Sequence, residues 1–528
     1  MMSFWLAIGL SVATWAGGPD VAVVCHPQFR PALMPWVHYR QAQGHRIAWV
    51  SPDDDPRVIR KRLIQLAQAA PIQSVLIVGD HGGPLGIPTF YLPGRVSIHF
   101  GSEPVYATDG PYGDIDGDRV PDLAVGRWSV DEPEQIAWQI EKVRVFESAR
   151  GAWRQQLHLV IGTGGFGPAI DGAIEQGVKR LLTRRVPDNY RITLTRASWR
   201  SPYCPAPEDF RSCVLDRLNE GGLFWVYAGH GQWNALDFMD VPSEDRIAIL
   251  RGEDAGELHY RRAPSIALFF SCYAGAFDAN EALAERFVRA RGGPVAAFAA
   301  SRVSMPFGMT VMATGLMDGY FEQRLKTLGR LWLSAQHRLA QKRLPLQDRW
   351  LEWSARLLSP KSNLLQEEKR EHIFLFNLLG DPLLRLPYPE PAQIAVAEPA
   401  VSSRPLKVTV DVPFAGRGYV ALINPRQTPR QALSERTEYP DSRSERARFT
   451  DEYRAANDLV WTRVPVTFDR KGRHLLSKAI SVPPSLVGKA RLWLFLESDD
   501  GRFASAVTPV DVAPVPVAQP APATPSRE

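Results

Sequence analysis

The chain has 528 residues, more than one ordinary hydrophobic core contains, so about two or three domains are expected. Its composition, with 45% hydrophobic and 23% charged residues, excludes a wholly disordered or fibrous chain. The formal net charge of +5 is small for this length, and Lys and Arg are scattered among Asp and Glu. Because they form no basic stripe or cluster, nucleic acid is not expected as a partner.

The first residues have the pattern of a secretory signal. An apolar stretch from Phe4 to Val12 is followed by Thr-Trp-Ala, which fits the small-x-small pattern before a cleavage point. The residues before this stretch include no Lys or Arg, so a buried first strand or helix is the alternative. We expect residues 1–16 to be a signal peptide and the protein to be exported to the periplasm, the cell surface or the medium. No other segment has the roughly 18–20 unbroken apolar residues of a membrane span, so none is predicted.

Residues 17–150 are predicted to form an N-terminal α/β subdomain. Apolar runs alternate with amphipathic helical patterns, which predicts strands at 21–24, 46–50 and 74–78 and helices at 31–43, after Pro56 and at 130–150. Residues 80–128 are rich in Gly and Pro and are predicted to be mostly loop. Strand–helix–strand repeats of this length favour a parallel sheet with helices on its faces.

Residues 151–390 repeat the same alternation and are predicted to form a second α/β subdomain. Strands are predicted at 157–162, 190–194, 223–228, 266–270 and 295–300, and helices at 171–184, 208–219 and 281–291. Two long helical stretches, at 309–344 and 348–376, are predicted to complete it.

The character of the chain changes after Pro387. Residues 391–402 are rich in Pro, Ala and Ser and are predicted to be a linker. Residues 403–512 contain short alternating runs without a helical pattern, which favours an immunoglobulin-like β-sandwich. The Pro- and Ala-rich residues 513–528 are predicted to be a disordered tail.

The four cysteines lack the spacing of a structural zinc site. Cys25 ends an apolar run and is interpreted as a small buried hydrophobe. In an exported protein Cys204 and Cys213 are close enough in sequence to form a local disulfide. Cys272 stands at the end of an apolar strand, a position that favours a reactive group.

Two segments share one pattern, a buried strand that runs directly into polar residues. The strand at 223–228 leads to Gly229, His230 and Gly231, and the strand at 266–270 leads to Ser271 and Cys272. In a parallel sheet such strand ends line the crevice where reactive groups gather. An imidazole beside a thiol there supports nucleophilic attack on a carbonyl carbon. The backbone N–H groups of Gly231 and Cys272 are candidate donors to the oxyanion.

These two motifs and their surroundings resemble the gingipain family of the caspase-like cysteine peptidase clan. The resemblance covers NEGGLFWVYAGHG, APSIALFFSCYAGAFD, NEALAERFVRARGGPVAAFAAS and FNLLGDPLLRL in this order, with YGDIDGDRVPDLAVGRWSV upstream. It implies a caspase-like three-layer parallel α/β sheet in two subdomains, followed by the immunoglobulin-like β-sandwich. It also implies Cys272 as the nucleophile and His230 as its proton-transfer partner.

The chain departs from the family at the third catalytic position. Gingipains carry an acidic residue at the end of the strand before the His motif, where this chain has Thr163. A hydroxyl can accept a hydrogen bond from an imidazole but supplies no charge, so the site is predicted to work as a dyad, to recruit Asp171 or Glu175, or to be weakly active. The resemblance implies Asp171 as the substrate-binding acid that selects a basic P1 side chain, and a helix N-cap is the alternative role.

A second group of carboxylates lies around a Gly turn at Asp114, Asp116, Asp118 and Asp122. Their alternate spacing matches the first half of a calcium-binding loop, and the resemblance implies structural calcium. The later positions of that loop do not match, because Arg119 and Val125 stand there. The alternative is a solvated Asx-turn loop. No cofactor is expected to be required for catalysis.

Together these patterns predict an exported cysteine endopeptidase or processing peptidase that acts on polypeptides through a Cys-His dyad and a thioester. One alternative is a weakly active or inactive relative that serves as a surface binding module through its β-sandwich. Another is a sorting transpeptidase of the same fold, in which an amine resolves the thioester. The sequence identifies no partner for the sandwich.

Overall fold

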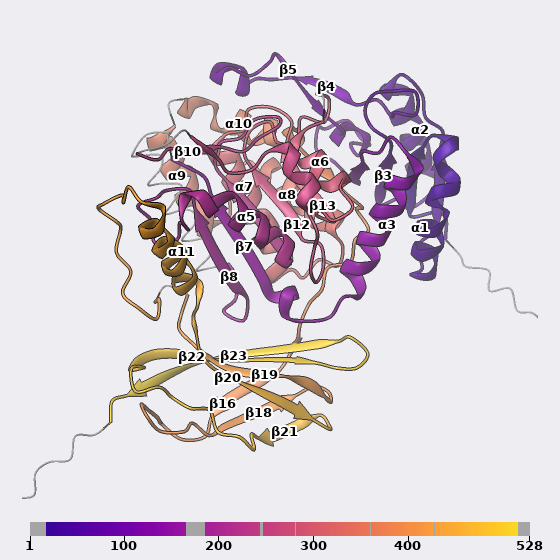
Figure 1. Ribbon diagram of the computed structural model, residues 1–528. Helices are drawn as coiled ribbons and strands as arrows, with labels where there is room; N and C mark the ends of the chain where they lie inside the picture. Colours follow the sequence, from indigo (N-terminus) through magenta and orange to yellow (C-terminus); the bar gives the residue numbers. More distant parts are fainter. Residues whose placement is uncertain are drawn as a thin grey trace, which may run out of the picture.

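The computed structural model describes residues 17–164, 185–242, 246–279, 281–359, 361–426 and 428–515. An α/β part carries a small two-sheet β part at one end, and the chain first passes from one to the other near residue 388 (Figure 1). The predicted signal peptide, most of the predicted tail and the predicted helix at 171–184 lie outside the described residues. Among the described residues, no helix is both long and apolar enough to cross a membrane.

A ten-stranded sheet runs through the whole α/β part in the order β2-β1-β3-β6-β14-β13-β12-β9-β7-β8. Its first-half strands are β1 (Val21–Cys25), β2 (Ile47–Val50), β3 (Ser74–Val78) and β6 (Ala124–Trp128). Its second-half strands are β7 (Gln156–Ile161), β8 (Arg191–Arg196), β9 (Phe224–Ala228), β12 (Ile266–Phe270), β13 (Ala296–Ala300) and β14 (Phe376–Leu379). The predicted strands are present, but the two predicted subdomains share this one sheet.

The two halves join at β14, a strand that the sequence analysis did not predict, since its helical stretch at 348–376 reaches only the first residue of β14. β14 is antiparallel to β13 and pairs with β6 at Leu379 and Arg127. The prediction of a wholly parallel sheet was therefore wrong at this strand. The run FNLL looks like the end of the preceding helical pattern, and its pairing depends on partners distant in sequence.

Helices cover both faces of the sheet and give it three layers (Figure 1). Along β12, Ile266, Leu268 and Phe270 enter one apolar core, whereas Ala267 and Phe269 enter the other. This alternation follows from the period of two in a strand, and burial on both faces explains the unbroken apolar sequence. The core on the first face includes residues of both halves, so the halves form one body.

The helices with core residues on the first face are α1 (Arg30–Ala42), α3 (Pro133–Ser148), α7 (Pro306–Met317), α8 (Leu328–Ala340), α9 (Arg349–Leu358) and α10 (Leu365–Leu375). The second face packs against α2 (Pro56–Ala69), α5 (Phe210–Glu220) and α6 (Leu283–Arg289). The segment predicted as loop at 80–128 also contains an antiparallel hairpin of β4 (Phe90–Pro93) and β5 (Val105–Thr108).

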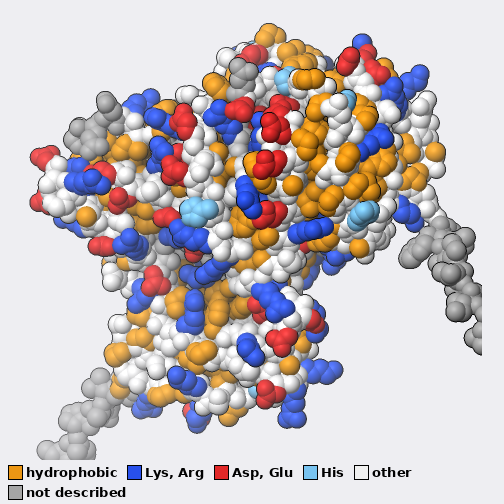
Figure 2. Space-filling view, turned by 45° about the vertical axis from the view of Figure 1, so that its right-hand side comes forward, with side chains coloured by type: hydrophobic (Ala, Val, Ile, Leu, Met, Phe, Trp, Pro, Cys, Tyr) orange, Lys and Arg blue, Asp and Glu red, His pale blue; other side chains and the backbone are white. Residues whose placement is uncertain are grey.

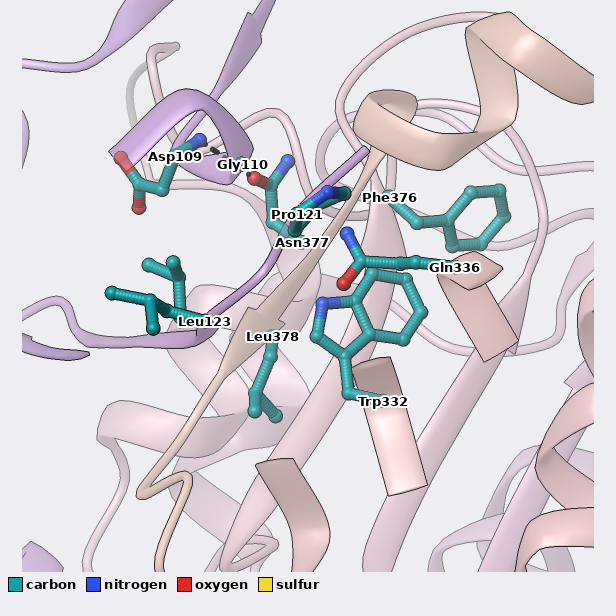
Figure 3. A pocket seen from close by; sticks show the side chains of 10 residues that line it. Asp109, Gly110, Pro121, Leu123, Trp332, Gln336, Phe376, Asn377 and Leu378 are labelled. Atoms are coloured by element: carbon teal, nitrogen blue, oxygen red, sulfur yellow. Dashed lines mark hydrogen bonds between the residues drawn. The ribbon is translucent and has the colours of Figure 1, made fainter. Parts of the chain in front are cut away.

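A small cavity of about 10 Å³ lies beside β14, where the halves meet. Figure 3 shows Trp332 and Gln336 of α8 next to Asn377 and Leu378 of β14. The backbone N–H of Asp109 donates to Asn377 Oδ1 at 3.0 Å across the joint. This volume holds about one water, so the joint is a packed contact that ties the halves together.

The C-terminal part consists of two β-sheets that share one apolar core. The larger contains β15 (Glu390–Pro391), β17 (Ala400–Val401), β19 (Gly416–Ile423), β20 (Val460–Phe468), β22 (Gly488–Glu497) and β23 (Phe503–Ala513). The smaller contains β16 (Gln393–Val396), β18 (Val408–Val412) and β21 (Gly472–Leu475). The prediction that residues 391–402 form an unpaired linker was wrong. They contain β16, which pairs with β18, and β17, which pairs with β23. An immunoglobulin-like arrangement stays a prediction.

The C-terminal part also contains a helix that the sequence analysis missed, α11 (Arg443–Asn457), inserted between β19 and β20. This helix packs against β8, the edge strand of the large sheet, where the Asn457 amide accepts from the N–H of Leu194 and donates to its carbonyl. An exposed edge strand presents unpaired backbone groups that can pair with another chain. α11 covers such an edge at β8. Figure 2 shows Lys and Arg side chains along the junction of the two parts, where Arg154 pairs with Glu497.

Candidate active site

His230 and Cys272 follow two neighbouring parallel strands of the large sheet. β9 and β12 pair in a register that sets Ala228 opposite Phe270, the last residue of each strand. His230 and Cys272 each stand two residues beyond this pair. The fold therefore brings together at one sheet edge the two residues that the sequence analysis selected.

The loops that carry the two residues are in direct contact. A Cβ atom at Gly231 would lie 2.7 Å from the carbonyl oxygen of Cys272 and 2.8 Å from the Ser271 side chain. No larger residue fits between them without displacing one loop. The N–H of Gly229 also donates to the carbonyl of Phe270 at 3.2 Å. The glycines that flank His230 thus allow its loop to lie against the loop of Cys272.

The thiol of Cys272 is mostly buried, and its nearest described polar contacts come from the end of β13. The N–H of Ser304 donates to Sγ at 3.3 Å, and the Ser304 hydroxyl lies 3.8 Å away. Burial raises the pKa of the Cys272 thiol above its ordinary value, and the contacts from Ser304 offset part of this rise. Sequence reasoning missed Ser304, which lies four residues beyond a strand that it had predicted.

The loop of His230 is anchored by a buried tyrosine of β9. Tyr227 Oη donates to the carbonyl oxygen of His230 at 2.7 Å. Burial raises the pKa of Tyr227 well above 10, so the group is a neutral donor. The backbone carrying the imidazole is thereby tied to the same strand that delivers it to the sheet edge.

Thr163, at the predicted third position, follows β7, the next strand beyond β9 in the sheet. Its hydroxyl donates to the carboxylate of Asp237. Sequence reasoning did not single out Asp237, because its short segment between Gln232 and Arg246 carries no strong pattern. Asp171 and Glu175, the other acids considered, lie outside the described residues.

The remaining cysteines are separate from the site. All four are free thiols, so the predicted pairing of Cys204 with Cys213 was wrong. Cys204 is buried, with its sulfur 3.6 Å from that of Met239. Burial raises the pKa of Cys25 and Cys204 to about 12 and of Cys213 to about 11, which makes them weak nucleophiles at neutral pH.

The acidic loop of the first half brings three of its four predicted ligands together. Carboxylate oxygens of Asp114, Asp116 and Asp122 lie within 4.8 Å of one another. The Asp118 carboxylate accepts instead from the N–H of Val120 at 2.7 Å, which is an Asx-turn contact. Three converging carboxylates are a donor set suited to a hard cation such as Ca²⁺, although N–H groups already occupy one oxygen each of Asp114, Asp116 and Asp122, and Arg60 pairs with Asp114 at 3.4 Å.

Comparison with solved structures places this arrangement in a known fold. The chain is similar to the Arg-specific cysteine proteinase gingipain R (RgpB), with 16% identity, a TM-score of 0.52, and coverage of 94% of this chain and 98% of that one. It is also similar to the complex of the RgpB pro- and mature domains from Porphyromonas gingivalis, with 16% identity, a TM-score of 0.51, and coverage of 93% and 100%. No curated protein matches the chain significantly.

The sequence also matches a family model over most of its length. The model of peptidase family C25 aligns with residues 14–387, which include the whole large sheet and both motifs. The chain therefore belongs to peptidase family C25, the gingipain family.

Proposed function

We propose that this protein is a cysteine endopeptidase or processing peptidase that cleaves peptide bonds with Cys272 as nucleophile and His230 as its proton-transfer partner. The observation that carries the proposal is the contact between the two loops, in which Gly231 lies against the Cys272 carbonyl at the ends of two paired strands. Membership of peptidase family C25 supports the same chemistry.

The proposed mechanism follows from the surroundings of the thiol. Burial disfavours the thiolate, so His230 accepts the thiol proton as Sγ forms a bond with the peptide carbonyl carbon. The N–H groups of Gly231 and Cys272 are proposed to stabilise the oxyanion. His230 then returns the proton to the leaving amine as the C–N bond breaks, and water hydrolyses the thioester. The N–H of Ser304 stabilises negative charge on sulfur before the bond forms.

We also propose that the protein is exported and that the acidic loop binds calcium as a structural ion. The apolar stretch at Phe4–Val12 supports export. The converging carboxylates of Asp114, Asp116 and Asp122 support calcium, and Asp118 is left out of the ligand set. In this role the ion would stabilise the loop and take no part in catalysis.

The experiment that tests the function is labelling of the purified protein with thiol-directed peptidyl inhibitors that carry varied P1 residues. Cys213→Ala is a matched control, because Cys213 is the other cysteine that is not fully buried. We expect Cys272→Ala to abolish labelling, His230→Ala to slow it at least about a hundredfold, and Cys213→Ala to leave it unchanged. Absence of Cys272-dependent labelling with every P1 residue would favour a binding module.

The labelled enzyme cannot distinguish hydrolysis from transpeptidation, so a second arm uses a peptide substrate with and without an added amine. A peptidase releases the free carboxyl product in both cases. A sorting transpeptidase releases the amide of the added amine instead, and that outcome would contradict the proposed hydrolysis.

A further inference from the structure

Asp237 lies opposite His230 in a tight hairpin that the sequence did not reveal. Gly231 and Leu236 form an antiparallel bridge, and the N–H of Gln232 donates to the carbonyl of Ala235 at 2.8 Å. This register makes His230 and Asp237 the next opposed pair. In an antiparallel pair, directly opposite residues have Cβ atoms about 4.5–5.5 Å apart and side chains on the same face.

Asp237 is held in place by two contacts to its carboxylate and two to its backbone. Oδ2 accepts from the hydroxyl of Thr163, and Oδ1 accepts from the N–H of Phe238 at 2.8 Å. Its backbone carbonyl accepts from the N–H of Ile249 at 2.9 Å. Its own N–H points to the hydroxyl of Tyr227 at 3.4 Å, the same group that donates to His230. Asp237 and His230 therefore share a rigid frame.

The charge of Asp237 is also available to the site. No Lys or Arg of the described residues pairs with it, whereas Asp240, three residues further along, pairs with Arg246 at 2.8 Å. The hydroxyl of Thr163 donates to the carboxylate and leaves its negative charge in place. A carboxylate near an imidazole favours the protonated imidazole.

We propose that Asp237 is the acid that positions His230 and stabilises its protonated form, and that Thr163 is the hydroxyl that orients the Asp237 carboxylate. The inference rests on the proposed function of Cys272 and His230. The acid, Asp237, would thus follow His230 in the sequence. The segment after β7, which precedes His230, would supply only the hydroxyl of Thr163. In this scheme the proton moves from Cys272 Sγ to His230 and from His230 to the leaving amine.

The test measures the rate at which iodoacetamide alkylates Cys272 in the full-length protein, from about pH 5 to 9, by intact mass in a Cys213→Ala background. The variants are His230→Ala, Asp237→Asn, Thr163→Val and the matched control Asp240→Asn. Alkylation needs no peptide substrate, so it reports on Cys272 and His230 without knowledge of the natural substrate. The thermal midpoint of each variant is recorded alongside.

We expect Asp237→Asn to slow alkylation near neutral pH about tenfold and to move the His230-dependent part of the profile to lower pH. Thr163→Val should give a smaller change in the same direction, about threefold, and Asp240→Asn none. A purely structural role for Asp237 would lower the thermal midpoint without moving the pH profile.

The outcomes separate this inference from the proposed function. If His230→Ala slows alkylation but Asp237→Asn behaves like Asp240→Asn, the pair stands and the role of Asp237 is overturned. If His230→Ala also has no effect, the proposed function fails. If Asp237→Asn does not fold, the pH profile of alkylation in Thr163→Val decides. A Thr163→Val profile identical to that of the wild type would overturn the inference.

Discussion

Two sets of strand ends in the large sheet carry charged or reactive side chains, and they differ in how completely these are paired. After β3 and β6, Asp80 and Asp131 join Glu281 and Glu285 around the guanidinium of Arg289. After β9 and β12, a buried thiol has N–H and hydroxyl contacts from Ser304 but no described cation.

The difference separates a structural cluster from a chemical one. Around Arg289 the carboxylates compensate one buried cation and lock α6 against the first half. Around Cys272 the fold places a mostly buried thiol at the same sheet edge as His230. The Asp237 carboxylate accepts from Thr163 and has no ion pair with any described Lys or Arg. A mostly buried thiol at the carboxyl edge of a sheet marks a candidate functional site, whereas an ion-pair network can perturb the pKa of its members and still be structural.

The largest effect is expected from breaking the contact between the two loops that carry His230 and Cys272. Gly231→Ala would place a Cβ 2.7 Å from the Cys272 carbonyl, so His230 and Cys272 must separate. A displacement of about 1 Å costs about a hundredfold in rate. The measurement is the rate of inhibitor labelling at Cys272, with Gly256→Ala as the control, because nothing lies within 4 Å of a Cβ there. Equal rates for the two variants would contradict the close packing.

A smaller effect is expected in the ion-pair cluster, and it depends on pH. Burial and the charge of Asp80 raise the pKa of Glu285 from 4.5 to about 8. A raised folded-state pKa means that the stabilisation is full below about pH 4 and is lost as the pH rises towards 8. Glu285→Gln mimics the protonated acid, so it should match the wild type near pH 4 and be more stable than the wild type near pH 8.

The measurement for this variant is urea unfolding at both pH values. Glu281→Gln is the control, because Glu281 contacts the same Arg289 while its side chain is 49% exposed. Its stability should follow the pH dependence of the wild type. A constant difference between Glu285→Gln and the wild type at the two pH values would refute the raised pKa.

The smallest effect is expected at the acidic loop. Its carboxylates converge as those around Arg289 do, but they lack a full set of cationic partners. Saturating calcium should raise the stability of the wild type by about 1 kcal/mol, because an ion that binds only the folded state stabilises it. Asp116→Asn should remove this gain and Asp118→Asn should keep it, since only Asp116 faces the other carboxylates. Thermal unfolding with calcium and with a chelator measures both. A gain that Asp118→Asn loses as well would restore Asp118 to the ligand set.

The elements around the site could be predicted because their signals are local. Continuous apolar runs gave the strands before His230 and Cys272 almost to the residue, since strands buried on both faces need such runs. The family resemblance added their pairing. The third member could not be predicted, because the link between Thr163 and Asp237 spans 74 positions and depends on the hairpin at Gly231.

Other parts of the fold escaped prediction for the same physical reason. β14 and α11 derive their stability from tertiary contacts, with β13 and β6 in one case and β8 in the other. The buried positions of α11 have helical spacing, but Arg446 and Thr450 are among them, so the sequence lacks the apolar stripe that marks an amphipathic helix. The segment at 391–402 reads as a linker by composition, yet its short strands add to sheets formed by later residues.

The central claim is that Cys272 and His230 form a working pair, and hydrolysis of a peptide library tests it most directly. The wild type, Cys272→Ala and His230→Ala are incubated with the library, and the products are identified by mass spectrometry. The account predicts cleavage by the wild type, none by Cys272→Ala and a loss of at least about a hundredfold in His230→Ala. Cleavage that survives in Cys272→Ala, or a wild-type rate in His230→Ala, would contradict it.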